Sequence, residues 1–105
     1  MFGLGEKSYQ MIIDTFRLFP EIETAVIFGS RAMGTNRKGA DVDIALQGKD
    51  ISYAVVSKVS TRLNEELPLP YYFDVLHYEA LDHRELKQHI DEEGKILYEK
   101  QYQYK

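Results

Sequence analysis

The residues from Asp41 to Leu46 place the strongest constraint on the fold, because acidic and apolar side chains alternate along them. Successive residues of a strand point to opposite faces of a sheet, so Val42, Ile44 and Leu46 are predicted to face a core. Asp41 and Asp43 then share the other face. Aspartate is disfavoured in strands, and a pair of them on an otherwise apolar strand indicates a site for chemistry.

The remaining patterns predict a single α/β domain over residues 1–105, with a small mixed sheet and helices packed against it. Apolar residues recur at helical spacing in Leu4–Phe19, in Asp50–Leu67 before Pro68, and in Asp82–Glu93. Runs rich in β-branched and aromatic residues predict further strands at Thr24–Phe28, Tyr71–Tyr78 and Lys95–Tyr98. Arg31–Ala40 is expected to be a loop with room for one helical turn at its start, and Glu99–Lys105 a polar tail.

Four residues are predicted to mark three helix ends. Asp50 is expected to cap the second helix. Asp82 and Glu85 form a D-x-x-E pattern, flanked by leucines, that is typical of a capping box with a hydrophobic staple. Gly94 is expected just beyond the end of the last helix.

Composition excludes several classes of protein. Apolar residues make up 44% of the chain and charged residues 29%, as in ordinary globular domains. The net charge is −4 and no Lys/Arg cluster is present, so binding of duplex nucleic acid is not expected. No apolar run is long enough to span a membrane, and Met1–Lys7 does not resemble a secretory signal. The absence of cysteine fits a cytoplasmic location.

Gly29 and Ser30 follow the predicted strand Thr24–Phe28 directly. A glycine allows the close backbone approach that a phosphate requires, and a serine that begins a helical turn offers a hydroxyl and unpaired N–H groups. Both residues are also common in ordinary turns. This pair alone therefore leaves an ordinary turn as the simpler interpretation.

Three acids together make the stronger case. Two neighbouring carboxylates repel each other unless a cation such as Mg²⁺ binds both. Asp74 lies in an apolar run and is expected to be buried, where it needs a partner. The alternatives are that Asp41 is a turn residue, that Asp43 lies at a solvated edge, and that Asp74 forms a salt bridge with a lysine or arginine.

With Asp41, Asp43 and Asp74 converging, the residues suit phosphoryl or nucleotidyl transfer with two Mg²⁺ ions. Asp41 and Asp43 would hold the metal that binds a triphosphate, and Asp74 would help to activate an attacking hydroxyl. Basic residues of the intervening loop are candidates to neutralise phosphate charge, although loop cations are often only solvated: these are Arg31, Arg37 and Lys38.

The three histidines give a weaker signal. His83 and His89 are six residues apart and fall on different faces of their predicted helix, so a transition-metal site is not favoured. Surface or structural roles are the preferred interpretation. His77 is the one histidine expected near Asp74.

The segments Gly29–Gly34, Gly39–Leu46 and Phe73–Val75 resemble, in order, the signature of the DNA polymerase β nucleotidyltransferase superfamily, and most of all its minimal nucleotidyltransferases. The resemblance implies a palm-like fold. It also implies nucleotide binding by Gly29 and Ser30, with ATP as substrate. Arg31, the first of the loop cations, is expected to join them as a nucleotide-binding residue. The resemblance further implies that Asp41, Asp43 and Asp74 bind the metal ions and carry out catalysis. Position 33 is methionine, where many relatives have arginine.

The same resemblance implies a partner. Minimal nucleotidyltransferases are often paired with a helical HEPN protein as antitoxin and toxin, and some transfer AMP to a tyrosine of that toxin. A hetero-oligomer is therefore expected. Two alternatives stay open: a catalytically idle antitoxin that binds nucleotide and neutralises its partner by contact, and transfer to an aminoglycoside-like drug, for which 105 residues offer little room.

Overall fold

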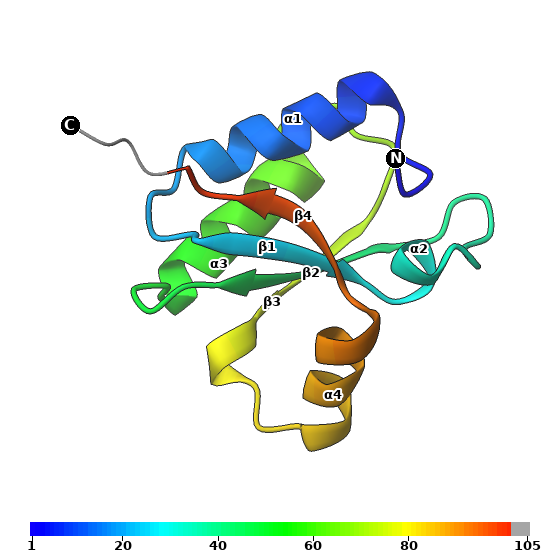
Figure 1. Ribbon diagram of the computed structural model, residues 1–105. Coiled ribbons are helices and arrows are strands. Elements are labelled where there is room, and N and C mark those ends of the chain that lie inside the picture. The colour runs from blue at the N-terminus through cyan, green and yellow to red at the C-terminus, as the bar shows by residue number, and fades with distance from the viewer. Residues whose placement is uncertain (102–105) are drawn as a thin grey trace.

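A computed structural model describes residues 1–101 of the chain. A four-stranded mixed sheet has the order β3-β2-β1-β4, in which β1 is antiparallel to β2 and β4, and β2 is parallel to β3 (Figure 1). The elements are α1 (Glu6–Arg17), β1 (Thr24–Phe28), α2 (Ser30–Met33), β2 (Val42–Gln47), α3 (Tyr53–Thr61), the π-helix η1 (Arg62–Glu66), β3 (Phe73–His77), the 3-10 helix η2 (Tyr78–Ala80), α4 (Arg84–Glu93) and β4 (Lys95–Glu99). The predicted fold class and order of elements are confirmed.

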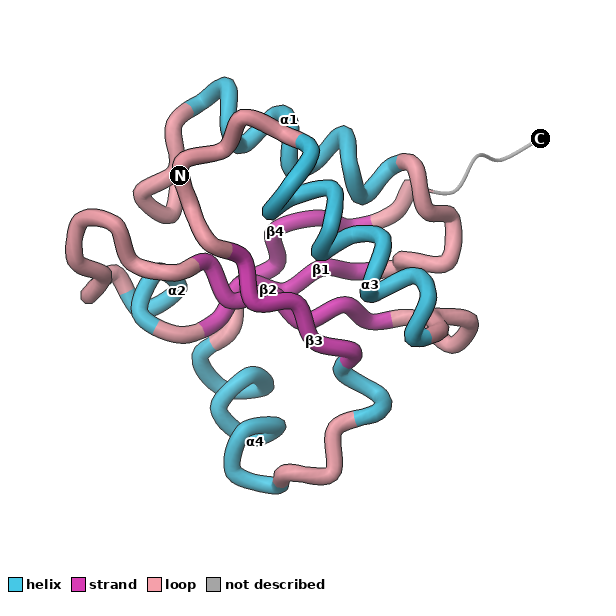
Figure 2. The backbone as a smooth tube through the Cα atoms, turned by 180° about the vertical axis from the view of Figure 1, so that it is seen from behind, coloured by secondary structure: helices cyan, strands magenta, loops and turns pink. Residues whose placement is uncertain are grey.

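The two faces of the sheet are covered unequally. Helices α1 and α3 lie over one face, and α4 and the short helix η2 lie on the side of the other (Figures 1 and 2). The predicted core side chains Val42, Ile44 and Leu46 are fully buried in the cluster with α1 and α3. On the α4 face, Ile90 packs in a smaller apolar cluster with Phe28 and its neighbours. The α4 face therefore has the smaller apolar core.

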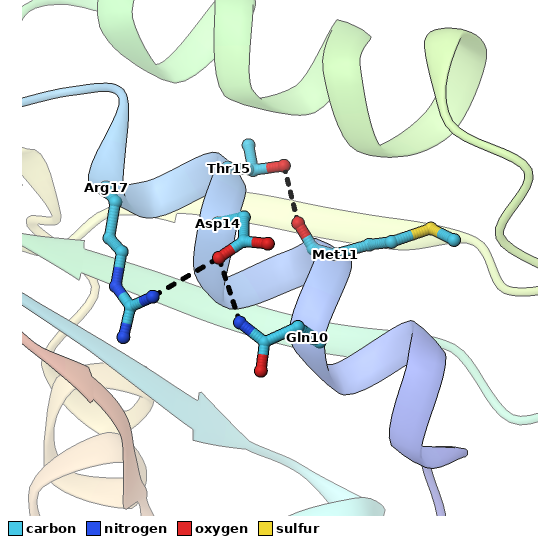
Figure 3. A network of polar contacts seen from close by, with 5 residues as sticks. All are labelled: Gln10, Met11, Asp14, Thr15 and Arg17. Carbon is cyan, nitrogen blue, oxygen red and sulfur yellow. Dashed lines mark hydrogen bonds and ion pairs between the residues drawn. The ribbon is translucent and has the colours of Figure 1, made fainter.

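Helix α1 separates polar and buried residues as its periodicity predicts. Asp14 accepts hydrogen bonds from Gln10 (2.9 Å) and Arg17 (3.3 Å) on the exposed side (Figure 3). Thr15 is buried, and its hydroxyl donates to the carbonyl of Met11 (2.9 Å), so no donor is left unpaired. The helix is shorter at both ends than the apolar pattern predicts, because the flanking residues form tighter turns.

A side-chain amide pairs with the first residue of edge strand β3. Asn64, in the π-helix η1, accepts from the N–H of Phe73 (2.8 Å) and donates to the carbonyl of Phe73 (2.9 Å). The side-chain amide of Asn64 thus makes the hydrogen bonds that a neighbouring strand would otherwise make with Phe73. Since Phe73 immediately precedes Asp74, the contact also fixes the start of the strand that carries this acid.

Two predicted helix starts are wrong by one or two residues. Ser52, and not Asp50, caps α3, because the serine Oγ accepts from the N–H of Val55 (3.3 Å). His83, and not Asp82, caps α4, because its Nδ1 accepts from the N–H of Leu86 (3.0 Å). The capping box is therefore absent.

Gly94 follows α4 as predicted but does not adopt a left-handed conformation, with φ of −66°. A side chain at this position would collide with the carbonyl of Ile90 and with Val26. None of the described helices is long and apolar enough to cross a membrane. The part of the predicted polar tail after Gln101 lies outside the described residues.

Candidate active site

The three predicted acids gather at one end of β2 and β3. Asp43 is paired in register with Asp74 on the parallel neighbour β3 and with Phe28 on β1. Residues in register on adjacent strands point to the same face, so the two carboxylates are neighbours. Asp41 lies one residue before β2, two positions from Asp43, and its charge contributes to raising the pKa of Asp43. The sheet thus brings together residues that are separated by up to 33 positions.

Burial and repulsion among these acids raise the pKa of Asp43. Burial raises its pKa above the ordinary value, and the charges of Asp74 and Asp41 raise it further. A cation placed among the three carboxylates would reverse the repulsion and favour the ionised forms. This electrostatic conflict is typical of a site that binds a positive ligand.

Asp74 is exposed, which corrects the expectation that it is buried. Strand β3 lies at the edge of the sheet, and its apolar neighbour Phe73 points to the opposite, fully buried face. Of the ion pairs within residues 1–101, none involves Asp41, Asp43 or Asp74. The alternative of a structural salt bridge for Asp74 therefore finds no support in the described part of the chain.

Gly29 lies directly beside Asp43 and cannot carry a side chain. Its backbone has φ of 74° and ψ of −155°, a combination that only glycine adopts readily. A Cβ atom at this position would lie 2.5 Å from Oδ2 of Asp43. The chain therefore passes as close to the carboxylate as a backbone can.

Ser30 opens α2 immediately after this glycine. The N–H of Met33 donates to the carbonyl of Gly29 (3.2 Å), and the N–H of Thr35 to the carbonyl of Ser30 (2.9 Å), which closes the turn at Gly34. The first N–H groups of a helical turn have no partner within it. Ser30 is half-buried, so part of this residue is open to a ligand.

Arg31 is placed differently from a solvated loop cation. The side chain is 3% exposed, and its guanidinium donates twice to the carbonyl of Ala40 (3.1 and 2.7 Å) and once to that of Phe2 (3.1 Å). Its carbon Cζ lies 5.0 Å from the centre of the Tyr71 ring. Arg31 therefore holds the loop before β2 against the N-terminus, and this position lends no support to the predicted phosphate contact. Arg37 and Lys38 are exposed on the same loop.

His89 is the site residue that sequence analysis missed. Its Nε2 accepts from the N–H of Gly29 (3.3 Å), and its ring packs edge-on against Phe28. His77, the histidine expected near Asp74, lies three residues further along β3 and contacts Glu79 (3.4 Å) instead. The signal that could have indicated His89 is its place beside Ile90, whose burial turns this part of α4 toward β1.

The donor set fits a hard cation, although the carboxylates do not yet enclose one. Within residues 1–101, no group of three or more potential ligands is arranged closely enough to hold a metal ion. The chemistry of the donors nevertheless suits Mg²⁺, which is commonly held by one or two carboxylates together with substrate phosphates. Part of the coordination would then come from a bound triphosphate.

Hollows elsewhere on the surface do not involve these residues. One of about 460 Å³ lies between α1 and β4 and is lined by residues such as Tyr9, Ile13 and Leu97. It contains none of the acids and neither residue of the Gly29–Ser30 turn.

One protein family matches most of the chain. The family model described as "Polymerase beta, Nucleotidyltransferase" matches residues 10–103. No protein of curated function matches the chain significantly in sequence.

Several solved structures share the fold. A toxin-antitoxin structure with AMP-PNP has 24% identity and a TM-score of 0.71, over 89% of this chain and 74% of that one. An MNT antitoxin in complex with the tri-AMPylated HEPN toxin of Shewanella oneidensis has 21% identity and a TM-score of 0.67, over 90% and 72%. A proposed nucleotidyltransferase from Sulfolobus solfataricus has 18% identity and a TM-score of 0.54, over 92% and 91%.

Proposed function

Because the chain belongs to the polymerase β nucleotidyltransferase family, we propose that it transfers AMP from ATP to a hydroxyl group, with Mg²⁺ as cofactor. The observation that carries the proposal is the pairing of Asp43 with Asp74 directly beside the Gly29 turn. A nucleotide-binding turn and a pair of acids are the minimum that such a reaction requires from the protein.

Each residue has a distinct part in this proposal. The Gly29–Ser30 turn binds the phosphates of ATP: Gly29 permits close backbone approach, while its own N–H is bound to His89, and Ser30 supplies a hydroxyl at the start of the turn. Asp41, Asp43 and Asp74 hold two Mg²⁺ ions, which would neutralise the charge of the triphosphate and of the pyrophosphate that leaves. Arg31 acts indirectly in this proposal. Its guanidinium is already bound to the carbonyls of Phe2 and Ala40, so it supports the loop before β2.

The proposed reaction is an in-line displacement. The acceptor oxygen forms a bond to the α-phosphorus of ATP while the bond from that phosphorus to the bridging oxygen breaks. Pyrophosphate leaves with the electron pair of the broken bond, and the acceptor hydroxyl gives up its proton to the carboxylate of Asp74. Asp74 is the most exposed of the paired acids, so we place the acceptor and the departing proton on its side of the site.

We further propose that the acceptor is a tyrosine of a HEPN toxin and that the chain acts as its antitoxin. Two structures with the same fold support this, a toxin-antitoxin structure with AMP-PNP and an MNT antitoxin bound to a tri-AMPylated HEPN toxin. The exposure of Asp74 is also consistent with a protein acceptor. The chain and its partner would form a hetero-oligomer.

The test is the double substitution Asp41→Asn and Asp43→Asn. With the purified partner and ATP labelled at the α-phosphate, we expect the wild-type chain to label the partner and the double variant to lose that labelling by roughly a hundredfold or more. Asparagine keeps the size of the side chain, so circular dichroism should show the same fold. The readouts are labelled partner and inhibition of the partner's toxicity.

The contact-only alternative makes the opposite prediction. A chain that neutralises its partner simply by binding would still protect cells when it carries both substitutions. Undiminished labelling by the double variant would also rule out the proposed role of these acids.

A further inference from the structure

We propose that His89 is a positioning residue for the nucleotide, because it fixes the Gly29–Ser30 turn that receives the phosphates. This inference rests on the proposed function. His89 comes from α4, about sixty residues after the turn, and it is the residue of that helix that contacts Gly29. Helix α4 would thus contribute to the site through this side chain.

The position of His89 is determined by its neighbours. Ile90, the next residue, is 2% exposed and packs in the apolar cluster with Phe28, which anchors α4 under β1. The imidazole ring lies 6.2 Å from the centre of the Phe28 ring at an angle of 78°, an edge-to-face arrangement. These two contacts hold the ring where its Nε2 meets the next backbone amide, that of Gly29.

Both polar backbone groups of Gly29 are therefore occupied. Its N–H donates to Nε2 of His89 (3.3 Å), and its carbonyl accepts from the N–H of Met33 (3.2 Å). The hydrogen bond from Met33 belongs to the turn itself, whereas the contact with His89 joins the turn to the rest of the fold. A glycine without a side chain has many accessible conformations, so an external contact of this kind restricts it.

The hydrogen bond also defines the state of the imidazole. Nε2 can accept from a backbone N–H only when it carries no proton, so the neutral ring has its proton on Nδ1. An acceptor at the same reach is the feature that a substitute must preserve. Glutamine has a side-chain oxygen at about that distance, whereas alanine has none.

Removal of the acceptor should weaken nucleotide binding without unfolding the chain. We expect His89→Ala to raise the Kd for Mg-ATP by about fivefold to tenfold, measured by titration calorimetry, because one hydrogen bond that orders the turn is lost. His89→Gln should restore binding to within about twofold of wild type. His83→Ala is the matched control, since His83 caps the same helix but does not contact the turn, and it should leave the Kd unchanged.

A second measurement observes the contact directly. In ¹⁵N–¹H spectra of the nucleotide-free chain, the Gly29 amide signal should shift and its hydrogen exchange should accelerate in His89→Ala. Both properties should return toward wild type in His89→Gln and stay unchanged in His83→Ala. The glutamine variant separates positioning from packing, because it loses the ring contact with Phe28 but keeps the acceptor.

The outcomes distinguish this inference from the function on which it rests. A wild-type chain that binds no Mg-ATP overturns the proposed function, and the role of His89 with it. A wild-type chain that binds Mg-ATP, with His89→Ala binding equally well or with an unchanged Gly29 amide, overturns the role of His89 alone. The role is likewise overturned if His89→Gln behaves like His89→Ala in both measurements.

Discussion

Replacement of Gly29 by alanine is expected to abolish nucleotidyl transfer and to lower the Tm by roughly 5–15 °C. Two effects combine at this position. The backbone conformation, with φ of 74° and ψ of −155°, is strained for any residue with a side chain. The added methyl group would also meet Oδ2 of Asp43 at 2.5 Å, so either the turn or the carboxylate must move.

Gly34→Ala is the matched control. Gly34 also has a positive φ, of 75°, but nothing lies within 4 Å of the place where a Cβ would be built. This variant should lose about 1 kcal/mol of stability from backbone strain alone and should keep its transfer activity. Thermal unfolding and the AMP-transfer assay measure both effects. Transfer by Gly29→Ala within a few-fold of wild type would show that the turn is not the phosphate site.

Asp43→Asn is expected to reduce transfer by roughly a hundredfold or more and, at the same time, to stabilise the metal-free chain at neutral pH. The loss of activity follows from the removal of a central carboxylate of the site. The gain in stability follows from the raised pKa of Asp43, which burial causes first and the charges of Asp74 and Asp41 increase. Ionised Asp43 opposes folding, and the neutral amide does not.

The direction of the pH dependence follows from the same shift. The pKa of Asp43 is higher in the folded chain than in the unfolded chain, so the folded state binds the proton more tightly. The stability that this group contributes is present at low pH and is lost as the pH rises through the folded pKa. The Tm difference between Asp43→Asn and wild type should therefore be largest near neutral pH and should shrink under acid conditions.

Chelator and control variants complete this experiment. Melting curves recorded with a chelator isolate the repulsion among the acids from any bound cation. Asp50→Asn removes the same charge from an exposed residue outside the site and should change the Tm little at any pH. A metal-free Asp43→Asn chain that melts below wild type at neutral pH would contradict the electrostatic account.

Local sequence patterns were sufficient for the elements on which the site is built. The strand Thr24–Phe28 has the predicted bounds, because its apolar run ends at the glycine that begins the turn. The alternation from Asp41 to Leu46 correctly predicted which residues of this segment face the core and that Asp43 faces the other side. Such an alternation with a period of two follows from strand geometry alone.

Features that depend on tertiary contacts could not be predicted in this way. Asp50 and Ser52 are both competent caps, as are Asp82 and His83, and the choice is made by how the helix packs. The burial of Arg31 depends on the carbonyls of Phe2 and Ala40, which no local pattern connects with it. These differences change the roles of individual residues but leave the order of elements intact.

Asp74 and His89 show the same limit within the site. An apolar run predicts burial on both faces, but β3 is an edge strand and exposes the face that carries Asp74. The contact of His89 with Gly29 joins residues 60 positions apart and depends on where α4 crosses the sheet. A helical pattern predicts which face of the helix carries a residue, but it does not predict which strand that face contacts.

The central claim is that the three acids and the Gly29 turn bind a divalent cation together with a nucleotide. The most direct test uses Mn²⁺ as a paramagnetic substitute for Mg²⁺ in ¹⁵N–¹H spectra with ATP present. The account predicts selective broadening of the amide signals of Gly29, Asp43 and Asp74 in the wild-type chain and its loss in the double variant Asp41→Asn and Asp43→Asn. Broadening centred elsewhere, or equal broadening in both proteins, would contradict the account.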